Sequence, residues 1–467
     1  MRHLFLCVSI LPVLLAGPVL AQPKTLQDAL AAAYSNNPTL QTARALLRAT
    51  DEGVPQALAG WRPTVVFAGS LGYGAGDITS SRVGPTGTNT TTTNRNNRDL
   101  NTNQLTLTQP IYRGGATRAG TNQADNRVFA QRGRLIASEQ TVFTNVINAY
   151  VNVIQTQQVL QLNINNEQVL ARQLQATNDR FRVGEITRTD VAQAEAALAG
   201  ARATRQTAEG NLQTARGTYR QYVGELPEQL IEPQPLKLPV KNQAEAVQLA
   251  SQNNPNVIAA LFDDAASRDN IDLQFAALMP QLSIQAQAAR VDGQTIAGQS
   301  SNVGQVVLNA SVPIYQGGAE YSRVRQARQQ QQQARKTVDD VRRQAVQLAT
   351  QAWETFTSTR ATIESTRAQI RANQIALEGV QREAIVGSRT TLDVLNAEQA
   401  LLNSRVTLVQ NLSAFVNASY LVAAAIGRLT AKDLNLNVPL YDETAYYNAV
   451  RQRLFGTGDY ATSQPGR

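Results

Sequence analysis

The fold is decided by a stretch that the chain contains twice, Pro110-Ile111-Tyr112-Arg113-Gly114-Gly115-Ala116 and Pro313-Ile314-Tyr315-Gln316-Gly317-Gly318-Ala319. The two stretches lie about 203 positions apart, and the same displacement relates Val183-Gly184 to Val386-Gly387 and Asp190 to Asp393. Self-similarity over so long a period indicates two copies of one structural unit.

The repeat continues upstream with a different displacement. Asn36-Asn37-Pro38 returns as Asn253-Asn254-Pro255, and Pro63 returns as Pro280, each about 217 positions later. The first copy therefore carries roughly fourteen extra residues between Pro63 and Pro110.

The N-terminus predicts a secretory leader over 1–21, because Arg2 precedes an apolar run and Val19-Leu20-Ala21 is a small-residue cleavage site. The first repeat then covers 22–239 and the second 240–440, and 441–467 forms a C-terminal tail. The only cysteine, Cys7, and the only histidine, His3, fall inside the leader. Disulfides, Cys/His zinc sites and His-dependent catalytic groups are thereby excluded from the exported chain, and we predict no enzyme activity, cofactor or metal.

The net charge of +8 does not indicate nucleic-acid binding, because the arginines alternate with acidic residues along Gln- and Ala-rich segments. After the leader, the sequence contains no apolar run of the 18 or more residues that a membrane-spanning helix requires. A passage through a membrane would then have to use strands.

Two proline-free stretches, 116–182 and 319–384, predict very long helices of about 100 Å each. Val128, Leu135 and Val142 recur every seven residues in the first, as in coiled coils, so these helices must pack beside others. Each long helix is expected to end in a short turn, 183–189 or 386–391, after which a shorter helix returns over 190–222 or 393–426. We expect single helices over 26–60 and 244–278.

Four segments alternate apolar and polar residues with a period of two and are about as long as strands that cross a bilayer: 64–75, 100–110, 281–290 and 303–312. A half-buried hairpin in a soluble domain would show the same pattern. The Thr- and Asn-rich segment 76–99 and the shorter 292–301 are expected to be solvated loops. We expect Pro110 and Pro313 to end strands, and Gly114, Gly115, Gly317 and Gly318 to redirect the chain from strand to helix.

Four strands are too few to close a barrel, since about eight is the smallest number seen, and open edges are not tolerated in lipid. Three copies would supply twelve strands and a water-filled lumen. The predicted fold is therefore mainly α with membrane β: a trimeric twelve-stranded β-barrel that continues into a long α-helical barrel.

Three motifs resemble the TolC-type outer-membrane efflux family: Gln109 to Gly115 with its second copy, Arg180 to Gly184 followed by Thr189-Asp190-Val191, and Val386 to Leu395. The resemblance covers most of the chain to about Leu440. It implies a homotrimeric exit duct in the bacterial outer membrane with a large periplasmic part. Such a duct would work with a periplasmic adaptor and an inner-membrane pump of RND or ABC type, in tripartite efflux or type I secretion of drugs, other small molecules or proteins.

The resemblance also assigns roles at the two helix turns. It implies adaptor contacts at Val183, Gly184, Glu185, Val386, Gly387 and Ser388, and a periplasmic gate formed by Asp393, Asn396, Arg389, Asp190 and Thr189. Asp393 matches an acidic ring, in which three carboxylates would attract cations and raise one another's pKa. Arg389 matches a polar tie to Thr189 and Asp190.

This chain departs from the family pattern at two gate positions. Asn396 stands where a second acidic residue is common, and Ala384 stands where a tyrosine would add to the tie. We therefore expect a weaker cation block and a looser closed entrance.

Plainer interpretations stay open at this point. Asp190 and Asp393 could serve only as helix N-caps, and Gly184 and Gly387 could serve only to end helices. A periplasmic or surface coiled-coil scaffold without a channel would explain the long helices, but it gives no reason for four amphipathic strands at repeated positions.

Overall fold

The computed structural model describes residues 24–293 and 298–460, so the predicted leader lies outside the described residues. The chain divides into two compact units. The sheet unit contains 39–138, 247–348 and 439–460, and the turn unit contains 24–38, 139–246 and 349–438. Each unit takes segments from both sequence repeats, so the repeats are structural copies and not separate compact bodies.

The helices before the strands are interrupted where the sequence analysis expected single helices over 26–60 and 244–278. The first copy forms α1 (Leu26–Asn36), α2 (Pro38–Asp51), α3 (Gly53–Leu58) and the 3₁₀ turn η1 (Ala59–Trp61). The second forms α6 (Gln243–Asn253), α7 (Pro255–Phe275) and η2 (Ala276–Leu278). A proline begins α2 and α7 because proline has no N–H to donate to the preceding turn, and Asn254 caps α7 by accepting from the Asn256 backbone.

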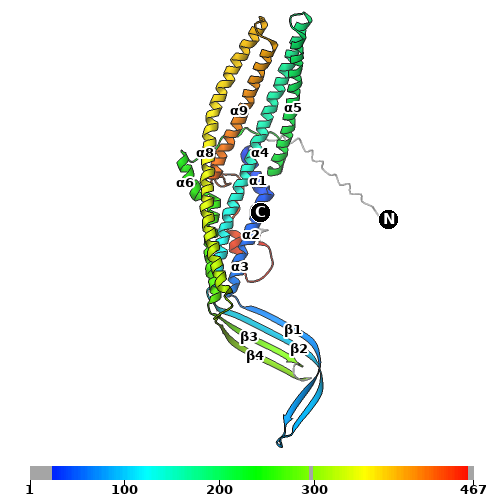
Figure 1. Cartoon of the computed structure of the whole chain (residues 1–467), viewed down its shortest axis with the longest axis vertical. Helices are drawn as coiled ribbons and strands as arrows, with labels where there is room; N and C mark the ends of the chain where they lie inside the picture. The colour runs from blue at the N-terminus through cyan, green and yellow to red at the C-terminus, as the bar shows by residue number, and fades with distance from the viewer. Residues whose placement is uncertain (1–23, 294–297, 461–467) are drawn as a thin grey trace, which may run out of the picture. The chain divides into compact units, whose positions relative to one another are not determined.

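One antiparallel sheet of order β1-β2-β3-β4 forms within the sheet unit (Figure 1). Its strands are β1 (Thr64–Val83), β2 (Asn89–Arg113), β3 (Gln281–Asp292) and β4 (Ser300–Ser311). Each predicted strand is therefore present, and β2 joins the sheet of the first copy to that of the second through β3.

The register gathers the apolar side chains on one face of the sheet. Val65 lies opposite Leu107, which lies opposite Ala286, which lies opposite Val306. The other face is mostly polar, and its side chains bond across strands, as in Gln305 Nε2 donating to Gln287 Oε1 at 2.9 Å. A sheet with one apolar and one polar face is suited to separate lipid from water.

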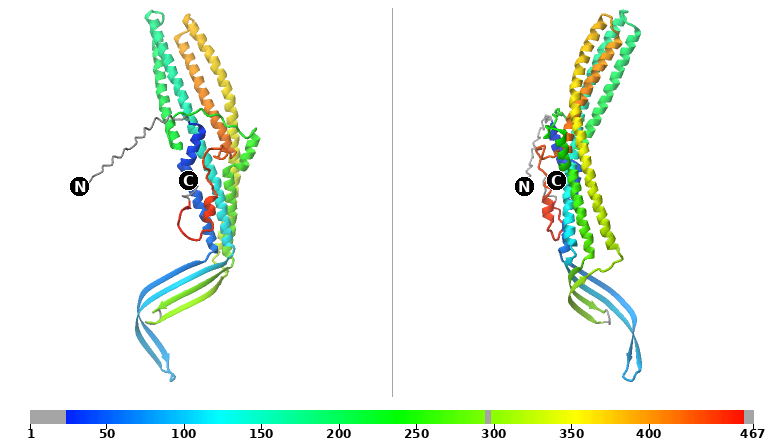
Figure 2. Two further views of the ribbon diagram at one scale, coloured as in Figure 1. Left: turned by 180° about the vertical axis from the view of Figure 1, so that it is seen from behind. Right: turned by 60° about the vertical axis from the view of Figure 1, so that its left-hand side comes forward.

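The expectation of a loop over 76–99 is wrong. Figures 1 and 2 show β1 and β2 continuing past the β3–β4 hairpin as a two-stranded ribbon, which turns at 84–88. Threonine is β-branched and favours extended backbone, and the Thr79 and Thr93 hydroxyls pair across the ribbon at 3.0 Å. The alternating apolar pattern is missing because both faces of the ribbon are solvated, as predicted for this segment.

The passage from strand to helix occurs at the paired glycines. Gly114, Gly115, Gly317 and Gly318 all have positive φ, between 61° and 91°. Pro313 follows the end of β4, as expected, but β2 runs past Pro110 to Arg113, with a register shift between Pro110 and Tyr112. The shift accommodates the missing proline N–H without ending the strand.

The long helices are α4 (Ala116–Arg182) and α8 (Ala319–Ile385), each of 67 residues, followed by α5 (Arg188–Val223) and α9 (Thr391–Ala425). These bounds confirm the expected long and returning helices to within two residues. Tyr150 on α4 is fully buried, and its hydroxyl lies 2.6 Å from the Ile231 carbonyl oxygen and 2.9 Å from that of Lys24. Tyr150 thereby links the first described residues to the segment between α5 and the second repeat, which contains Ile231.

Contrary to the expectation from apolar runs, one helix among the described residues is long and apolar enough to cross a membrane by composition. This helix is α9, with a mean hydropathy of 1.2 over its best window, of which 44% is buried within the chain. Core helices of soluble domains meet the same criterion, so α9 is weak evidence of a membrane span.

The C-terminal tail, to which the sequence assigned no role, packs within the sheet unit as far as Tyr460. It contains α10 (Ala445–Val450) and lies beside α2 and α3 (Figures 1 and 2). The Tyr446 hydroxyl donates to Glu52 Oε1 at 2.8 Å, and the Tyr447 hydroxyl donates to Asp125 Oδ1 at 2.8 Å.

Candidate functional site: the two helix turns

The turn after α4 ends the helix with paired backbone hydrogen bonds. Gly184 N donates to Phe181 O at 2.9 Å, and Glu185 N donates to Arg180 O at 3.0 Å. This is a Schellman motif, which needs a left-handed residue, and Gly184 supplies it with a φ of 78°.

The turn after α8 repeats the arrangement. Gly387 N donates to Ala384 O at 3.3 Å, Ser388 N donates to Glu383 O at 3.0 Å, and Gly387 has a φ of 82°. An added Cβ would meet no atom within 4 Å at Gly184 or Gly387, so only the backbone conformation requires glycine in the single chain. The interpretation of these glycines as helix terminators is therefore correct, and it does not exclude a second role.

The next helix of each hairpin begins with a capping box. Thr187 is the N-cap of α5 and Thr390 that of α9, and each threonine backbone N–H donates to an aspartate three residues on, at 3.0 Å for Asp190 and 2.9 Å for Asp393. The aspartates are thus not the N-caps themselves but the third residues of capping boxes.

These bonds favour the charged carboxylates. The Thr187 hydroxyl, followed by its backbone N–H, lowers the pKa of Asp190, and the Thr391 hydroxyl of the other hairpin adds to the effect. The backbone N–H and hydroxyl of Thr390 lower the pKa of Asp393. Within the single chain the pKa of both aspartates is therefore lowered. The raised pKa expected for three converging carboxylates would arise only where copies meet.

The predicted gate residues lie around these two capping boxes. Arg389 Nε lies 2.9 Å from Glu383 Oε2 on its own hairpin, so within the described chain Arg389 is paired at its own turn. The tie from Arg389 to Thr189 and Asp190 stays a prediction for the assembled protein. Sequence patterns did not indicate Glu383, because its contact with Arg389 forms only when the chain reverses direction at the turn.

The remaining gate positions differ in accessibility. Asn396 is exposed on α9, one turn beyond Asp393, whereas Ala384 is buried under the second turn. A side chain larger than alanine at position 384 would have to displace its neighbours in the single chain.

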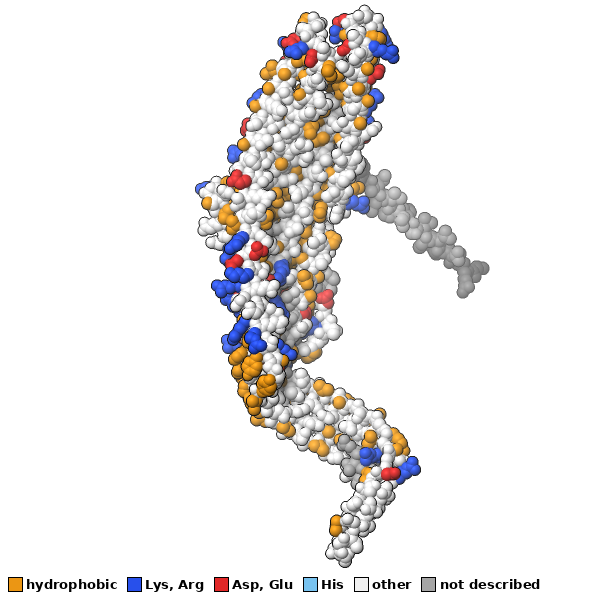
Figure 3. All heavy atoms as spheres, viewed as in Figure 1, with side chains coloured by type: hydrophobic (Ala, Val, Ile, Leu, Met, Phe, Trp, Pro, Cys, Tyr) orange, Lys and Arg blue, Asp and Glu red, His pale blue; other side chains and the backbone are white. Residues whose placement is uncertain are grey.

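The predicted adaptor residues expose an apolar side chain at each of the two turns. The exposed fraction is 78% for Val183 and 79% for Val386, and Ile385, which the sequence analysis did not select, is exposed to 77%. Glu185 pairs with Arg180 at 2.7 Å, and Figure 3 shows acidic and basic side chains close together at these turns. Exposed aliphatic side chains framed by charges are typical of protein contact surfaces.

The two hairpins touch through α5 and α9. Leu170, Leu198, Ala201 and Leu395 form a small buried cluster there, and Glu398 lies beside it. Burial raises the pKa of Glu398, although Gln381 Nε2 donates to its carboxylate at 3.1 Å.

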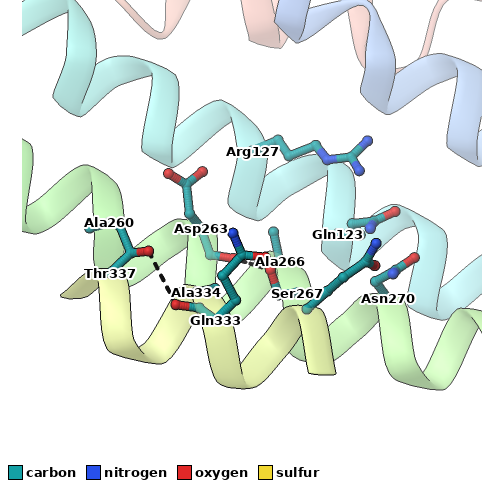
Figure 4. A pocket seen from close by; sticks show the side chains of 11 residues that line it. Gln123, Arg127, Ala260, Asp263, Ala266, Ser267, Asn270, Gln333, Ala334 and Thr337 are labelled. Carbon is teal, nitrogen blue, oxygen red and sulfur yellow. Dashed lines mark hydrogen bonds between the residues drawn. The ribbon is translucent and has the colours of Figure 1, made fainter. Parts of the chain in front are cut away.

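A separate cavity lies between α4, α7 and α8 in the sheet unit (Figure 4). Amide and hydroxyl side chains predominate in its lining, with Arg127 and Asp263 as the charged members. Asp263 is already paired with Arg134. A wall of this composition is suited to contact with water, and the cavity shows no nucleophile with an adjacent base.

The comparisons with known proteins agree with this architecture. The family model described as outer membrane efflux protein matches 29–225 and 246–428, one match in each repeat. The outer membrane efflux protein BepC of Brucella suis biovar 1 is 35% identical over 95% of both chains. The outer membrane protein TolC of Escherichia coli K12 is 27% identical over 72% of this chain and 71% of its own.

The fold is also that of a solved channel. The Campylobacter jejuni CmeC outer membrane channel superposes with a TM-score of 0.74 over 86% of this chain and 85% of that one, at 17% identity. From the two family matches and the relative similar over its full length, we conclude that the chain belongs to the TolC family of outer membrane efflux proteins and is an outer-membrane efflux channel with a periplasmic helical part, not an enzyme.

Proposed function

We propose that three copies of the chain assemble into one passive exit duct. The observation that carries this proposal is the sheet with two open edges: β1 and β4 each pair with one neighbour only among the described strands. Unpaired strand edges are not stable in lipid, and four strands are half the number in the smallest closed barrels, about eight. Three copies would give twelve strands, an even number with room for a lumen.

The two helix turns are proposed as the docking points of a periplasmic adaptor. Val183, Gly184 and Glu185 at the first turn, and Val386, Gly387 and Ser388 at the second, present nearly the same backbone twice. An adaptor hairpin would therefore find two similar binding sites on each copy. The pump behind the adaptor would be of RND or ABC type, and the cargo would be drugs, other small molecules or proteins.

At the entrance, Asp393 from each copy is proposed to form an acidic ring, with Arg389, Thr189 and Asp190 holding neighbouring hairpins together. Because Glu383 already binds Arg389 in the single chain, closing the tie would require Arg389 to exchange one carboxylate for another. Asn396 in place of a second acidic residue weakens cation binding, and Ala384 contributes no hydroxyl to the tie.

The assembly is tested by extracting the protein from membranes and measuring its mass and conductance. We expect release by detergent but not by salt, the mass of three chains, and a conducting pore in planar bilayers. A salt-released monomer without conductance would refute the duct and restore the scaffold interpretation.

The gate is tested by Asn396→Asp, with Asn403→Asp, farther along α9, as a matched control. A second ring of carboxylates should strengthen the block of conductance by divalent cations from the periplasmic side, because converging charges bind cations more tightly. Equal block in the parent and in Asn396→Asp would contradict the gate assignment.

A further inference from the structure

The first turns of α8, which follow the sheet, carry basic side chains that nothing in the described chain neutralises. Between Ala319 and Lys336 the sequence has five basic residues and a single carboxylate, that of Glu320, which is buried. Arg325 and Arg328 are exposed, and neither forms an ion pair with another residue that the structure describes. Figure 3 shows Lys and Arg side chains gathered over the helices near the sheet.

Three of these exposed side chains share one face of the helix. Tyr321, Arg325 and Arg328 follow one another at intervals of four and three residues, the spacing of neighbours on a helix surface. Tyr321 is 50% exposed. We call these three residues the basic face of α8.

The polar cavity of the sheet unit lies on the opposite side of α8. Gln330 and Thr337 line this cavity. Residues two positions apart point in nearly opposite directions around a helix of about 3.6 residues per turn. Because Arg328 precedes Gln330 by two positions and Arg335 precedes Thr337 by two, the basic face is turned away from the cavity.

The C-terminal tail covers the equivalent face of α4. Asp125 accepts a hydrogen bond from the Tyr447 hydroxyl at 2.8 Å, and the Arg132 guanidinium lies 5.4 Å from the centre of the Tyr447 ring. A displacement of 203 relates Asp125 to Arg328 and Arg132 to Arg335. The chain has only one such tail, so the face that is covered on α4 is left uncovered on α8.

The tail also identifies the outer side of the duct proposed above. A passive duct needs an open lumen, and three tails, each with the helix α10, would obstruct it from within. The tail-bearing face of α4 is therefore the outer one, and the cavity, whose amide and hydroxyl wall suits contact with water, lies on the lumen side. By equivalence of the repeats, the basic face of α8 also points outward.

We propose that the basic face of α8 binds the phosphate groups of anionic phospholipids in the periplasmic leaflet of the outer membrane. The proposal rests on the duct proposed above and adds a ligand to its outer surface. Side chains on a helix lean toward its N-terminus, and the N-terminus of α8 follows the sheet. The Arg325 and Arg328 side chains would therefore extend toward the membrane.

The positions along the helix fit the headgroup layer of a bilayer. Arg325 lies six residues after Ala319 and Arg328 lies nine after it, which is a rise of about 9 Å and about 14 Å. The headgroup layer is roughly 5–8 Å thick on each side of the hydrocarbon. A long arginine side chain can reach back to it while the charged end stays hydrated. Tyr321, about 3 Å along the helix, has the amphipathic side chain that is typical of a membrane interface.

Charge complementarity favours an anionic lipid over the other occupants. Uncovered arginines without nearby carboxylates attract anions and would repel the same face of a second copy. An anionic cargo would have to meet them from the lumen, but the basic face lies on the outer side. Clusters of basic side chains beside a membrane are a recognised means of holding anionic headgroups.

The test measures phospholipid binding to the purified protein in detergent by native mass spectrometry. Phosphatidylglycerol is the anionic probe, and phosphatidylethanolamine is the zwitterionic one. The site variant is Arg325→Gln with Arg328→Gln, and Arg325→Lys with Arg328→Lys keeps both charges. The matched control is Arg360→Gln with Arg371→Gln, which removes two exposed arginines farther along α8 that also lack an ion pair among the described residues.

One arginine near an anionic surface strengthens binding by about fivefold, so the site variant should bind phosphatidylglycerol roughly 25-fold more weakly than the parent. The control and the lysine variant should stay within about threefold of the parent, because both keep the charge of the basic face. No variant should alter the binding of phosphatidylethanolamine. In the parent, phosphatidylglycerol binding should weaken as the salt concentration rises.

Equal phosphatidylglycerol binding by the parent and the site variant would overturn the proposal, and so would a loss that lysine does not restore. Preferential binding of lipopolysaccharide at these arginines would assign the basic face to the wrong lipid. A changed ion selectivity in planar bilayers, with lipid binding unchanged, would place the arginines in the lumen. In each case a conducting protein with the mass of three chains leaves the duct standing, whereas a monomer in detergent would refute both proposals.

Discussion

Replacing Asp51 by asparagine should stabilise the sheet unit and reduce its sensitivity to pH. Asp51 ends α2 and has no exposed surface, and neither of its carboxylate oxygens has a hydrogen-bond partner among the described residues. Burial raises its pKa from 3.8 to about 7; Arg132 and Arg48 oppose this rise, and Glu52 and Glu443 add to it. Ionised Asp51 is thus an unfavourable buried charge.

The sign of the pH effect follows from the two pKa values. Between about pH 4 and pH 7 the unfolded chain has lost the Asp51 proton and the folded chain still holds it, so the free energy of unfolding falls as the pH rises. A tenfold change in an acid constant corresponds to about 1.4 kcal/mol, so the full penalty is roughly 4 kcal/mol above pH 7. About 2 kcal/mol of it develops between pH 5.5 and pH 8.

The assay is thermal unfolding of the detergent-purified protein at about pH 5.5 and pH 8, scanned at one rate. Asp51→Asn removes the charge and keeps the shape, so its midpoint should exceed that of the parent, by more at pH 8 than at pH 5.5. Asp77→Asn, on the exposed ribbon, is the control for a lost charge without burial. If Asp51→Asn keeps the parent's pH dependence, the carboxylate is not held in the buried, unpaired state described here.

Three further outcomes are expected. Tyr150→Phe removes the hydroxyl shared by the Ile231 and Lys24 carbonyls and should lower the free energy of unfolding by about 1–3 kcal/mol, measured by denaturant titration; an unchanged midpoint would show that water replaces the hydroxyl. Thr187→Ala removes an N-cap and should cost about 1 kcal/mol in the first turn of α5, which hydrogen exchange at that turn would reveal; unchanged exchange would argue against the capping box. Gly114→Ala should greatly reduce the yield of folded membrane protein, because the new Cβ would lie 2.5 Å from Met279 Cβ. Gly184→Ala, whose new Cβ would meet no atom within 4 Å, should fold nearly normally. Equal yields of the two variants, measured by heat-modifiable migration on gels, would contradict the close contact at Gly114.

The amino-acid sequence by itself determined the repeat, the long helices and the alternating strands. These features depend on local patterns, namely proline-free stretches, heptad spacing and a period of two, which the chain carries wherever it folds. The same local logic identified the glycines that end α4 and α8, because only glycine adopts the left-handed conformation of those turns without strain.

Sequence patterns did not predict the structure where local signals were absent or ambiguous. The ribbon over 76–99 has no apolar alternation because both faces are wet, so its strands could not be distinguished from a polar loop. The break at Asn37-Pro38 was likewise visible as a motif, but whether a proline kinks a helix or begins a new one depends on the neighbouring packing.

Tertiary structure alone decided which distant groups meet. It placed Asp51 in a buried site with its charge unpaired, brought Glu383 to Arg389, and covered Gly114 with η2 while leaving Gly317 open. Such contacts join residues far apart along the chain or across a turn, and their free energy depends on burial and distance, which a linear sequence does not contain. The repeated motif could show that the two junctions are alike, but only the folded chain shows that η2 covers Gly114 while no described residue lies within 4 Å of a Cβ placed on Gly317.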